Sequence, residues 1–559
     1  MSKSVLLCLP ALLLLGTQQG LAQCGLPGPH ETARGSVFID SDADGRFTEG
    51  ESGLAAVAVS NGCEVVLTDA SGRYEIPVAA NEILFISKPA AYSLALDEFN
   101  VPRFFYRHYP QGTPAAIAGT AVEWLFPVVE ATGPLPDNID FPLYESTAGK
   151  QFKAHGFADT QARYESSQDM LREDLINPLI GNPHSVDFGL TVGDVVYDNL
   201  DIYPRHKAMM ALMDIPQWYL PGNHDINFES PDAWFANETY KRHFGPTYYS
   251  FNHGNVHFVA LNNVEYAGNG REIDGASYRG YIPDHQLQWL AADLSHVDPD
   301  KLIVIATHIP LVAEASDGRN PPAFGPNTEN FQALLEILEP FEHIYGLAGH
   351  DTSNSWKVQV DHRHGWGGLP WIAHTLAEVR GNGWNRGPAD LRGVRDAMME
   401  DGNPNGYYVL HFNDTELVPE FIPFPFGSDA GQRLRITLDP PLTAVGDSIN
   451  RGQLQADTHI VVNLFDGGMR DQVWLSLDGA APVAMQYTVR TDPFVERAHA
   501  RFAASDDAYG TARRSSHVWQ WPLPATLEPG LHSVLISSED EFGQTRRGSF
   551  SFELLPTDD

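Results

Sequence analysis

YLPGNHD, residues 219–225, joins an apolar run to three side chains that bind metals or transfer protons. The run through Tyr219 and Leu220 meets a Pro-Gly pair, which marks a turn. Asn223, His224 and Asp225 then place an amide, an imidazole and a carboxylate on that turn. The stretch predicts a buried strand that ends at a site of metal-binding or proton-transfer chemistry.

The same arrangement, an apolar strand that stops at a polar residue, recurs between residues 150 and 420. HGFADTQ ends on Asp159 and Gln161, GLTVGD on Asp194, IVIATH on His308 and YGLAGH on His350. Taken singly, an Asp or Asn after a strand usually caps a turn, and a lone histidine is usually a hydrogen-bonded core residue. Recurrence at five strand ends disfavours that explanation.

Segments with helical apolar spacing lie between these strands, among them PDHQLQWLAADLSHV and NTENFQALLEILEPF, residues 283–297 and 327–341. Alternating strands and helices predict an α/β core. Open α/β sheets bind ligands at the carboxyl ends of their strands, so the five endings are expected to converge. Oxygen and imidazole ligands without thiolate suit Mn, Fe or Zn, and a carboxylate shared by two ions would make a dinuclear centre.

The order Asp-x-His/Gln, Gly-Asp, Gly-Asn-His-Asp/Glu, His, Gly-His-x-His resembles that of the calcineurin-like metallophosphoesterases. GDVVYDNLDIYP, FGPTYYSFNHGNVHF and DGNPNGYYVL add to this resemblance, which covers nearly the whole chain after residue 22. It is closest to a secreted bacterial subgroup with a β-sandwich on each side of the catalytic domain. The resemblance implies a multidomain fold in which a central α/β (αββα-type) metallophosphoesterase domain is flanked by two all-β sandwich domains.

The resemblance also implies a division of roles among the residues of the site. Asp194 would bridge two metal ions; one ion would be completed by Asn223, His308 and His350, and the other would be held by Asp159 and Gln161. A water activated by the metals would attack phosphorus. His224 would protonate the leaving oxygen as the general acid, while Asp225 would orient its ring and keep it cationic.

The segment GHDTSNSW departs from the family pattern. Two residues after His350, where the pattern has a second histidine, this chain has Thr352, so the Asp159 metal lacks a ligand. Asp351, water or one of three downstream histidines would fill the gap, or the ion would bind weakly, or activity would be lost. The three histidines are His362, His364 and His374, for which surface or packing roles are the alternative.

An acidic loop near the amino terminus, DSDADGRFTEGE at residues 40–51, fits the pattern D-x-D-x-D-G-x5-E. Its carboxylates, Asp40, Asp42, Asp44 and Glu51, occupy the positions that bind Ca²⁺ in such loops, and Gly45 provides the sharp turn. The flanking segments are strand-like, so we expect a structural calcium loop in a sandwich domain. A solvated acidic turn is the alternative.

Short alternating segments with Gly, Asp and Ser between them predict sandwiches on both sides of the core. We expect a signal peptide at residues 1–22, an antiparallel N-terminal β-sandwich at 24–141, the catalytic domain at 150–420 and a C-terminal β-sandwich at 433–556. The signal peptide is indicated by Lys3, a short apolar run and the small residues Gly20 and Ala22.

Cleavage of that peptide would leave Cys24 and Cys63, an even pair in an oxidising compartment. A disulfide between them is therefore expected, with two buried thiols as the alternative. The expected location is secreted or periplasmic. A lipoprotein anchored at Cys24 is an alternative, although Gln23 stands where such signals have a small residue.

The 36 basic and 72 acidic residues give a net charge of −36. Such a surface repels nucleic acids and anionic membranes. The apolar run near the amino terminus is too short to span a bilayer, and no comparable run follows it. The sequence favours an exported phosphoesterase that hydrolyses phosphate mono- or diesters of small molecules or envelope components. The alternative is a degenerate phosphoesterase that serves as a surface or envelope binding protein.

Overall fold

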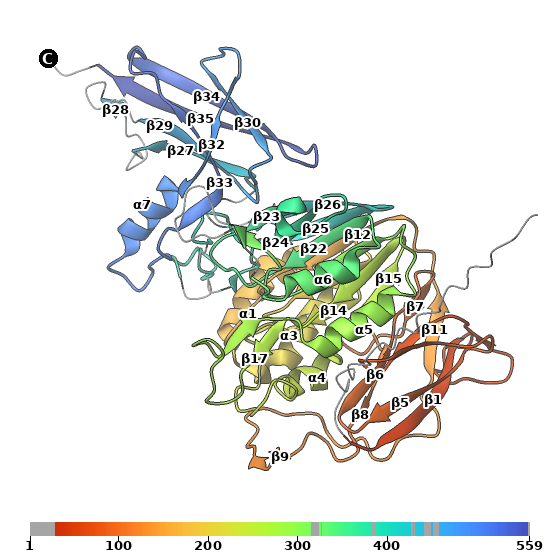
Figure 1. Ribbon diagram of the computed structural model, residues 1–559. Helices are drawn as coiled ribbons and strands as arrows, with labels where there is room; N and C mark the ends of the chain where they lie inside the picture. The colour runs from red at the N-terminus through yellow and green to blue at the C-terminus, as the bar shows by residue number, and fades with distance from the viewer. Residues whose placement is uncertain are drawn as a thin grey trace, which may run out of the picture.

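The computed structural model describes residues 28–556 except 315–323, 326, 382–385, 397, 426, 428, 430, 441–448 and 451–457. Figure 1 shows a central body of sheets and helices with a β-domain at each side, the N-terminal one in red and orange and the C-terminal one in blue. The predicted architecture, an αββα domain between two β-sandwiches, is confirmed. Among the described residues, no helix combines the length and apolar character that a membrane crossing needs.

The N-terminal domain consists of two facing sheets. The first has the order β2-β1-β11-β7, with β5 also paired to β1, and the second has the order β4-β3-β6-β8. Their bounds are β1 (His30–Ile39), β2 (Ser52–Gly53), β3 (Ala58–Ser60), β4 (Val65–Leu67), β5 (Arg73–Ala79), β6 (Glu82–Ile86), β7 (Tyr92–Leu94), β8 (Phe105–His108) and β11 (Phe141–Glu145). Alternation of exposed and buried residues along β5 is what a strand with one solvent face requires. One pair, β1 with β11, is parallel rather than antiparallel, because a long excursion returns the chain to β1 in the same direction.

The central domain contains two packed sheets. One has the order β14-β13-β12-β25-β26 and the other the order β15-β16-β19-β22-β24-β23. The bounds of the first are β12 (Gln151–Phe157), β13 (Phe188–Val192), β14 (Gln217–Leu220), β25 (Gly406–Asn413) and β26 (Glu416–Pro423). Those of the second are β15 (Tyr249–His253), β16 (Val256–Ala260), β19 (Leu302–Ala306), β22 (His343–Ala348), β23 (Trp356–Val360) and β24 (Trp371–Thr375). Strands β13, β14, β16 and β19 are buried along their whole length, as their predominantly apolar sequences require.

Aromatic rings fill the space between the two sheets. Trp218 of β14 stacks on Phe251 of β15 with ring centroids 4.0 Å apart, and Phe251 stacks on Phe258 at 4.7 Å. Offset stacking of this kind adds to the burial of large apolar surfaces. The sheets are thereby fixed against each other, so that strand ends of both belong to one rigid framework.

Helices cover the outer faces of the two sheets. On the first sheet lie α1 (Glu165–Leu171), which continues through a π-helical turn into α2 (Asn177–Leu179), and α3 (Tyr203–Met210). On the second lie α5 (Asp284–Leu294) and α6 (Phe331–Leu338), whose residues Trp289 and Leu334 are buried in the core. Helix α4 (Glu238–Phe244) packs beside Tyr219. The helices predicted within residues 283–297 and 327–341 are confirmed as α5 and α6.

The C-terminal domain is a second two-sheet sandwich, with the orders β27-β29-β33-β32 and β28-β35-β34-β30-β31. The bounds are β27 (Leu434–Asp439), β28 (Ile449–Asn450), β29 (His459–Leu464), β30 (Gln472–Leu477), β31 (Val483–Ala484), β32 (Gln486–Thr491), β33 (Arg514–Pro522), β34 (Gly530–Glu539) and β35 (Thr545–Leu555). One helix, α7 (Pro493–Phe502), begins at Asp492, whose side chain accepts a hydrogen bond from the Phe494 amide.

A buried carboxylate joins this domain to the central one. Asp466, just after β29, accepts hydrogen bonds from Tyr408 Oη at 2.8 Å and pairs with His374 Nε2 at 3.0 Å. The ammonium of Lys357 contacts both its carboxylate and its main-chain oxygen. A second link pairs His517 Nε2 with Asp401 Oδ2 at 2.7 Å. These paired groups hold the C-terminal sandwich against β23, β24 and β25.

Candidate metal centre

The polar residues singled out in the sequence stand just beyond the carboxyl ends of strands in both central sheets. Asp159 follows β12, Asp194 follows β13 and Asn223 follows β14, all in the first sheet. His308 follows β19 and His350 follows β22, both in the second sheet. Residues separated by almost 200 positions therefore meet at one edge of the packed sheets.

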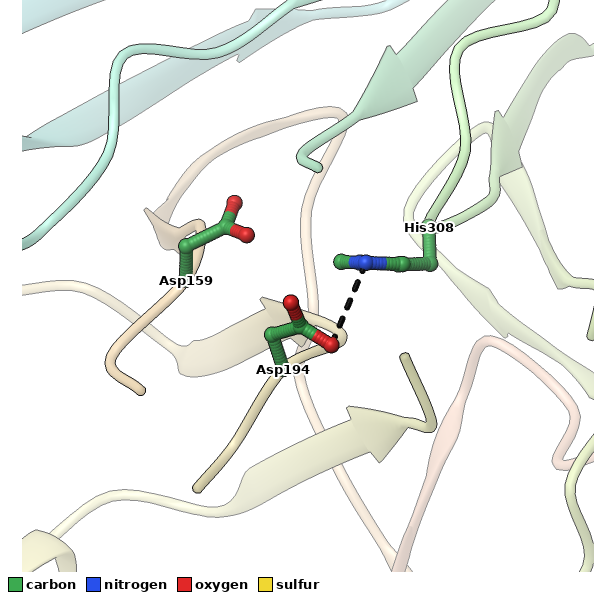
Figure 2. Close-up of side chains that lie close together, drawn as sticks. All are labelled: Asp159, Asp194 and His308. Carbon is green, nitrogen blue, oxygen red and sulfur yellow. Dashed lines mark ion pairs between the residues drawn. The ribbon is translucent and has the colours of Figure 1, made fainter. Parts of the chain in front are cut away.

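Two carboxylates and an imidazole form the centre of this cluster. Ligand atoms of Asp159, Asp194 and His308 all lie within 4.8 Å of one another, and all three side chains are buried. Figure 2 shows the three side chains facing one another, with His308 Nε2 3.2 Å from Asp194 Oδ1. The cluster is a candidate metal centre, here called the strand-end cluster.

Two further residues extend the strand-end cluster on the His308 side. Asn223 Oδ1 lies 3.0 Å from His308 Nε2 and 2.7 Å from His350 Nδ1. Atoms bound about 2.1 Å from one ion at adjacent coordination positions stand roughly 3 Å apart. The observed separations, 2.7 to 3.2 Å, therefore fit a shared divalent ion.

Gln161 gives an independent indication of a metal site on the Asp159 side of the cluster. Its Nε2 donates to Asp194 Oδ2 at 2.6 Å, and its Oε1 is buried without a hydrogen-bond partner among the described residues. A buried amide oxygen that accepts nothing is unfavourable unless a cation or water satisfies it. The residues present on both sides thus fit metal ions.

The backbone at these strand ends adopts an uncommon conformation. Asp159, Gln161, Asp194 and His350 have φ values of +51°, +47°, +47° and +72°. Non-glycine residues rarely occupy this left-handed region, and they concentrate at functional sites. Glycines beside them permit close approach: a Cβ at Gly222 would stand 2.1 Å from Asp194 Oδ1, and one at Gly349 would stand 2.5 Å from Asp159 Oδ2. These contacts explain the glycines of the Gly-Asn-His-Asp and Gly-His motifs.

Burial and mutual charge set the protonation of the strand-end cluster. Burial raises the pKa of Asp159 to about 7, against the opposing charge of His308. Burial also acts against ionisation of Asp194, but the charges of His308 and His224 outweigh it and hold its pKa below the usual range. Burial lowers the pKa of His350 to about 3, so this imidazole is neutral, which is the form that binds metals.

His224 stands at the edge of the cluster with a defined ring orientation. Its Nδ1 lies 2.7 Å from Asp198 Oδ1, and its ring stacks on Tyr197 with centroids 3.9 Å apart. The side chain keeps 20% exposure, so a substrate can reach it. Burial disfavours the charged ring, but the charge of Asp194 and the Asp198 hydrogen bond outweigh it and raise the pKa of His224 above its usual value.

The prediction that Asp225 orients His224 is wrong. Asp225 is wholly buried and accepts hydrogen bonds from the amides of Gly222 at 2.8 Å and Val195 at 3.1 Å, and from Tyr203 Oη at 2.7 Å. Adjacent side chains on this turn point in different directions, so Asp225 ties the turn after β14 to the turn after β13. The orienting carboxylate is Asp198, which sequence reasoning missed.

Of the side chains proposed to replace the missing histidine at Thr352, Asp351 and His374 are engaged elsewhere. Asp351 Oδ1 accepts from the Ser353 amide and hydroxyl at 3.0 and 2.6 Å. His374 is held between Tyr345 and Asp466. His362 and His364 lie in a 3₁₀ turn after β23, where Asp361 caps the turn.

The predicted calcium loop brings three of its four carboxylates together. Oxygens of Asp40, Asp42 and Asp44 lie within 4.8 Å of one another. Asp40 is 4% exposed, its Oδ2 accepts from Gly45 N and Tyr144 Oη, and its Oδ1 has no hydrogen-bond partner among the described residues. Glu51 is not part of that group, because its oxygens accept from the amides of Ser41 and Thr48 and close the loop instead.

The predicted signal peptide, residues 1–22, lies outside the described residues, as does Cys24. The Cys24–Cys63 disulfide therefore stays a prediction.

Comparisons with known proteins bear on the family. No curated protein matches the chain. A structural match is the purple acid phosphatase from yellow lupin (Lupinus luteus) seeds, 11% identical with a TM-score of 0.32, over 70% of this chain and 66% of that one, just under two thirds of its length. Three family models match in the order expected of the domains: the N terminal of calcineurin-like phosphoesterase at residues 41–118, calcineurin-like phosphoesterase at 153–354, and the C terminal of calcineurin-like phosphoesterase at 374–545. With these matches along its length, the chain belongs to the calcineurin-like phosphoesterases.

Proposed function

We propose that the protein is a metal-dependent phosphoric ester hydrolase that works with two divalent ions, Mn, Fe or Zn, at the strand-end cluster. The observation that carries the proposal is the convergence of Asn223 Oδ1, His308 Nε2, His350 Nδ1 and Asp194 Oδ1, with the separations of 2.7 to 3.2 Å described above. A core histidine or a turn-capping asparagine does not require such convergence. Family membership supports the same reaction class.

Two ions would divide these ligands. Asn223, His308 and His350 would hold one, and Asp159 and Gln161 would hold the other. Asp194, which contacts both His308 and Gln161, would be shared. Bound there, the ions would supply Lewis-acid activation of the phosphoryl group and of the attacking water.

His224 delivers the proton to the leaving oxygen. Asp198 accepts from Nδ1 and fixes the ring, which leaves Nε2 as the donor toward the substrate. Tyr197 supports one face of the ring, and the guanidinium of Arg163 lies 5.1 Å from the Tyr197 centroid. This arginine places a positive charge near the site, which favours an anionic phosphoester.

The substrates we propose are small-molecule or envelope phosphoesters rather than nucleic acids, because a net charge of −36 repels polynucleotides. We also propose secretion or export to the periplasm, on the basis of residues 1–22. The Cys24–Cys63 disulfide and a structural Ca²⁺ held through Asp40, Asp42 and Asp44 belong to the same proposal.

The test uses metal-stripped protein, reloaded with Mn²⁺, Fe²⁺, Zn²⁺ or Mg²⁺ and assayed on alkyl and aryl phosphate mono- and diesters. We expect hydrolysis with at least one metal. His224→Ala should lower the alkyl ester rate about a hundredfold and the aryl rate far less, because an aryl leaving group needs no proton. His296→Ala, at an exposed histidine, is the matched control.

A binding protein with a degenerate site is the second candidate, favoured by Thr352. Absence of hydrolysis with every metal and ester would support it and reject the enzyme. Equal losses of alkyl and aryl activity in His224→Ala would assign His224 to phosphate positioning instead of proton donation.

A further inference from the structure

A buried carboxylate that the proposed function does not use lies close to the strand-end cluster. Glu378 is 2% exposed. Its Oε1 accepts from Asn405 Nδ2 at 3.1 Å, while its Oε2 is buried without a hydrogen-bond partner among the described residues. A buried charge of this kind is strongly unfavourable unless it is paired or coordinates a cation. Glu378 therefore has unused capacity to bind a cation.

The backbone that carries Glu378 runs beside Asp159. Val379 N donates to Ala158 O at 2.7 Å, and Gly381 N donates to Asp159 O at 2.8 Å. Glu378 follows β24, which is parallel to β22 in the second sheet. It therefore stands at the same carboxyl edge as His308 and His350, as a further polar residue beyond a strand end.

The Glu378 carboxylate also lies beside Thr352. A Cβ built on Gly381 would stand 1.6 Å from Glu378 Oε2 and 2.8 Å from Thr352 Cγ2, so these two atoms are neighbours in one small space. A histidine at position 352 would direct its ring into this region. Threonine is shorter than histidine, and the Glu378 carboxylate reaches into the same region from the segment after β24.

We propose that Glu378 supplies the ligand that Thr352 lacks and completes the Asp159 metal site. The inference rests on the proposed metal centre and deepens it. With Glu378 included, the Asp159 side offers only oxygen ligands, from Asp159, Gln161, Asp194 and Glu378, whereas the other side offers two imidazoles. Carboxylate and amide oxygens suit Mn²⁺ and Mg²⁺, and imidazoles suit Zn²⁺ and Fe²⁺. The two positions therefore select different metals, a hard ion at Asp159 and a softer ion at His308.

The experiment is a Mn²⁺ titration of Zn²⁺-loaded protein, with free Mn²⁺ measured by electron paramagnetic resonance and bound metals measured by elemental analysis. Wild type should retain one Zn²⁺ and bind one Mn²⁺. Glu378→Gln should retain the Zn²⁺ and bind Mn²⁺ at least about tenfold more weakly. Glu336→Gln, at an exposed side of α6, is the control and should match wild type.

Thermal unfolding separates a ligand from a residue that is merely buried. In chelator, Glu378→Gln should be as stable as wild type or more stable, because an amide of the same shape replaces a buried carboxyl group that burial disfavours in its charged form. Addition of Mn²⁺ should raise the melting temperature of the wild type more than that of the variant, since an ion that binds the folded state stabilises it. The proposal would be overturned if the difference in melting temperature between wild type and Glu378→Gln were the same with and without Mn²⁺.

A compensating variant gives a second test. The double variant Thr352→His with Glu378→Ala should again bind a second metal ion. The preference of that second site should shift from Mn²⁺ toward Zn²⁺. If wild type binds two metals and hydrolyses esters while Glu378→Gln keeps both affinities, the role of Glu378 is rejected and the proposed function stands. If wild type binds no metal through His308 and His350, the proposed function itself fails.

Discussion

His224 Nδ1 and Asp198 Oδ1 are joined by a hydrogen bond of 2.7 Å, although Asp225 is the carboxylate next to His224 in the chain. Asp198 lies four residues after Asp194, on the turn that follows β13. The strand that carries the central carboxylate of the cluster therefore also carries the group that orients the proposed acid. The turn after β14 positions His224, and the turn after β13 orients its ring.

Asp198→Asn should reduce hydrolysis of an alkyl phosphoester by about ten- to a hundredfold, because the ring of His224 loses its charged partner. An aryl ester should lose much less, and bound metal should not change. Steady-state rates on both esters check the prediction. Asp201→Asn, at an exposed aspartate nearby, is the control; a variant at Asp198 with unchanged alkyl rates would contradict the assigned role.

Asp194→Asn should remove or weaken both metal ions together, because its two oxygens contact His308 on one side and Gln161 on the other. Two cations at about 3.5 to 4 Å need a negative charge between them. Elemental analysis after dialysis gives the result. Full occupancy of both positions in the variant would reject the bridging role, and Asp300→Asn serves as the exposed control.

Asp42→Ala combined with Asp44→Ala should lower the melting temperature only in the presence of Ca²⁺. Three carboxylates within 4.8 Å repel one another unless a cation lies between them, so in chelator the double variant should match or exceed the wild type. Catalysis at the strand-end cluster should be unaffected. The calcium site is rejected if Ca²⁺ does not stabilise the wild-type protein.

Asp466→Asn should destabilise the protein by roughly 3–5 kcal/mol, because Lys357 then remains charged and buried without its partner. Burial acts against ionisation of Asp466, but the charges of Lys357 and His374 outweigh it and hold its pKa below the usual range. A carboxylate with a depressed folded-state pKa stabilises the fold above its unfolded pKa of about 3.9, and loses that effect as the pH falls further.

The difference in melting temperature between wild type and Asp466→Asn should therefore be large at pH 7 and shrink below about pH 4. Asp506→Asn, at an exposed position, should show little difference at either pH. A constant difference across this range would mean that shape rather than charge links the two domains.

The strand ends could be predicted from the sequence because each combines a local apolar run with a local polar stop. Asp159 and Asp194 needed only the rule that parallel strands present their carboxyl ends at one edge, whereas His308 also depends on how the second sheet packs on the first. The roles of Asp198 and Asp225 could not be predicted, because sequence adjacency does not determine which way a side chain on a tight turn points. Only the folded turn shows that Asp225 faces the amides of Gly222 and Val195.

Glu378 was missed for a different reason. In HTLAEVRGN it follows a strand by three residues, the same signal as the other strand ends, but a histidine was the expected substitute because this chain has Thr352 where the family pattern has a second histidine. That β24 lies between β22 and β23, beside the Thr352 loop, is a property of sheet order. Sheet order at this end is decided by long-range pairing, which a single sequence does not reveal.

The left-handed backbone conformation destabilises the fold at residues that are proposed to bind metal, namely Asp159, Gln161, Asp194 and His350. Each non-glycine residue in that region is disfavoured by about 1–2 kcal/mol, so the surrounding sheets must impose the conformation. We therefore expect the ligands to be positioned before an ion binds, so that metal binding requires little rearrangement of these strand ends. Glycine at any of these positions would relieve that strain but would remove a proposed ligand, so the strain is tied to the ligands themselves.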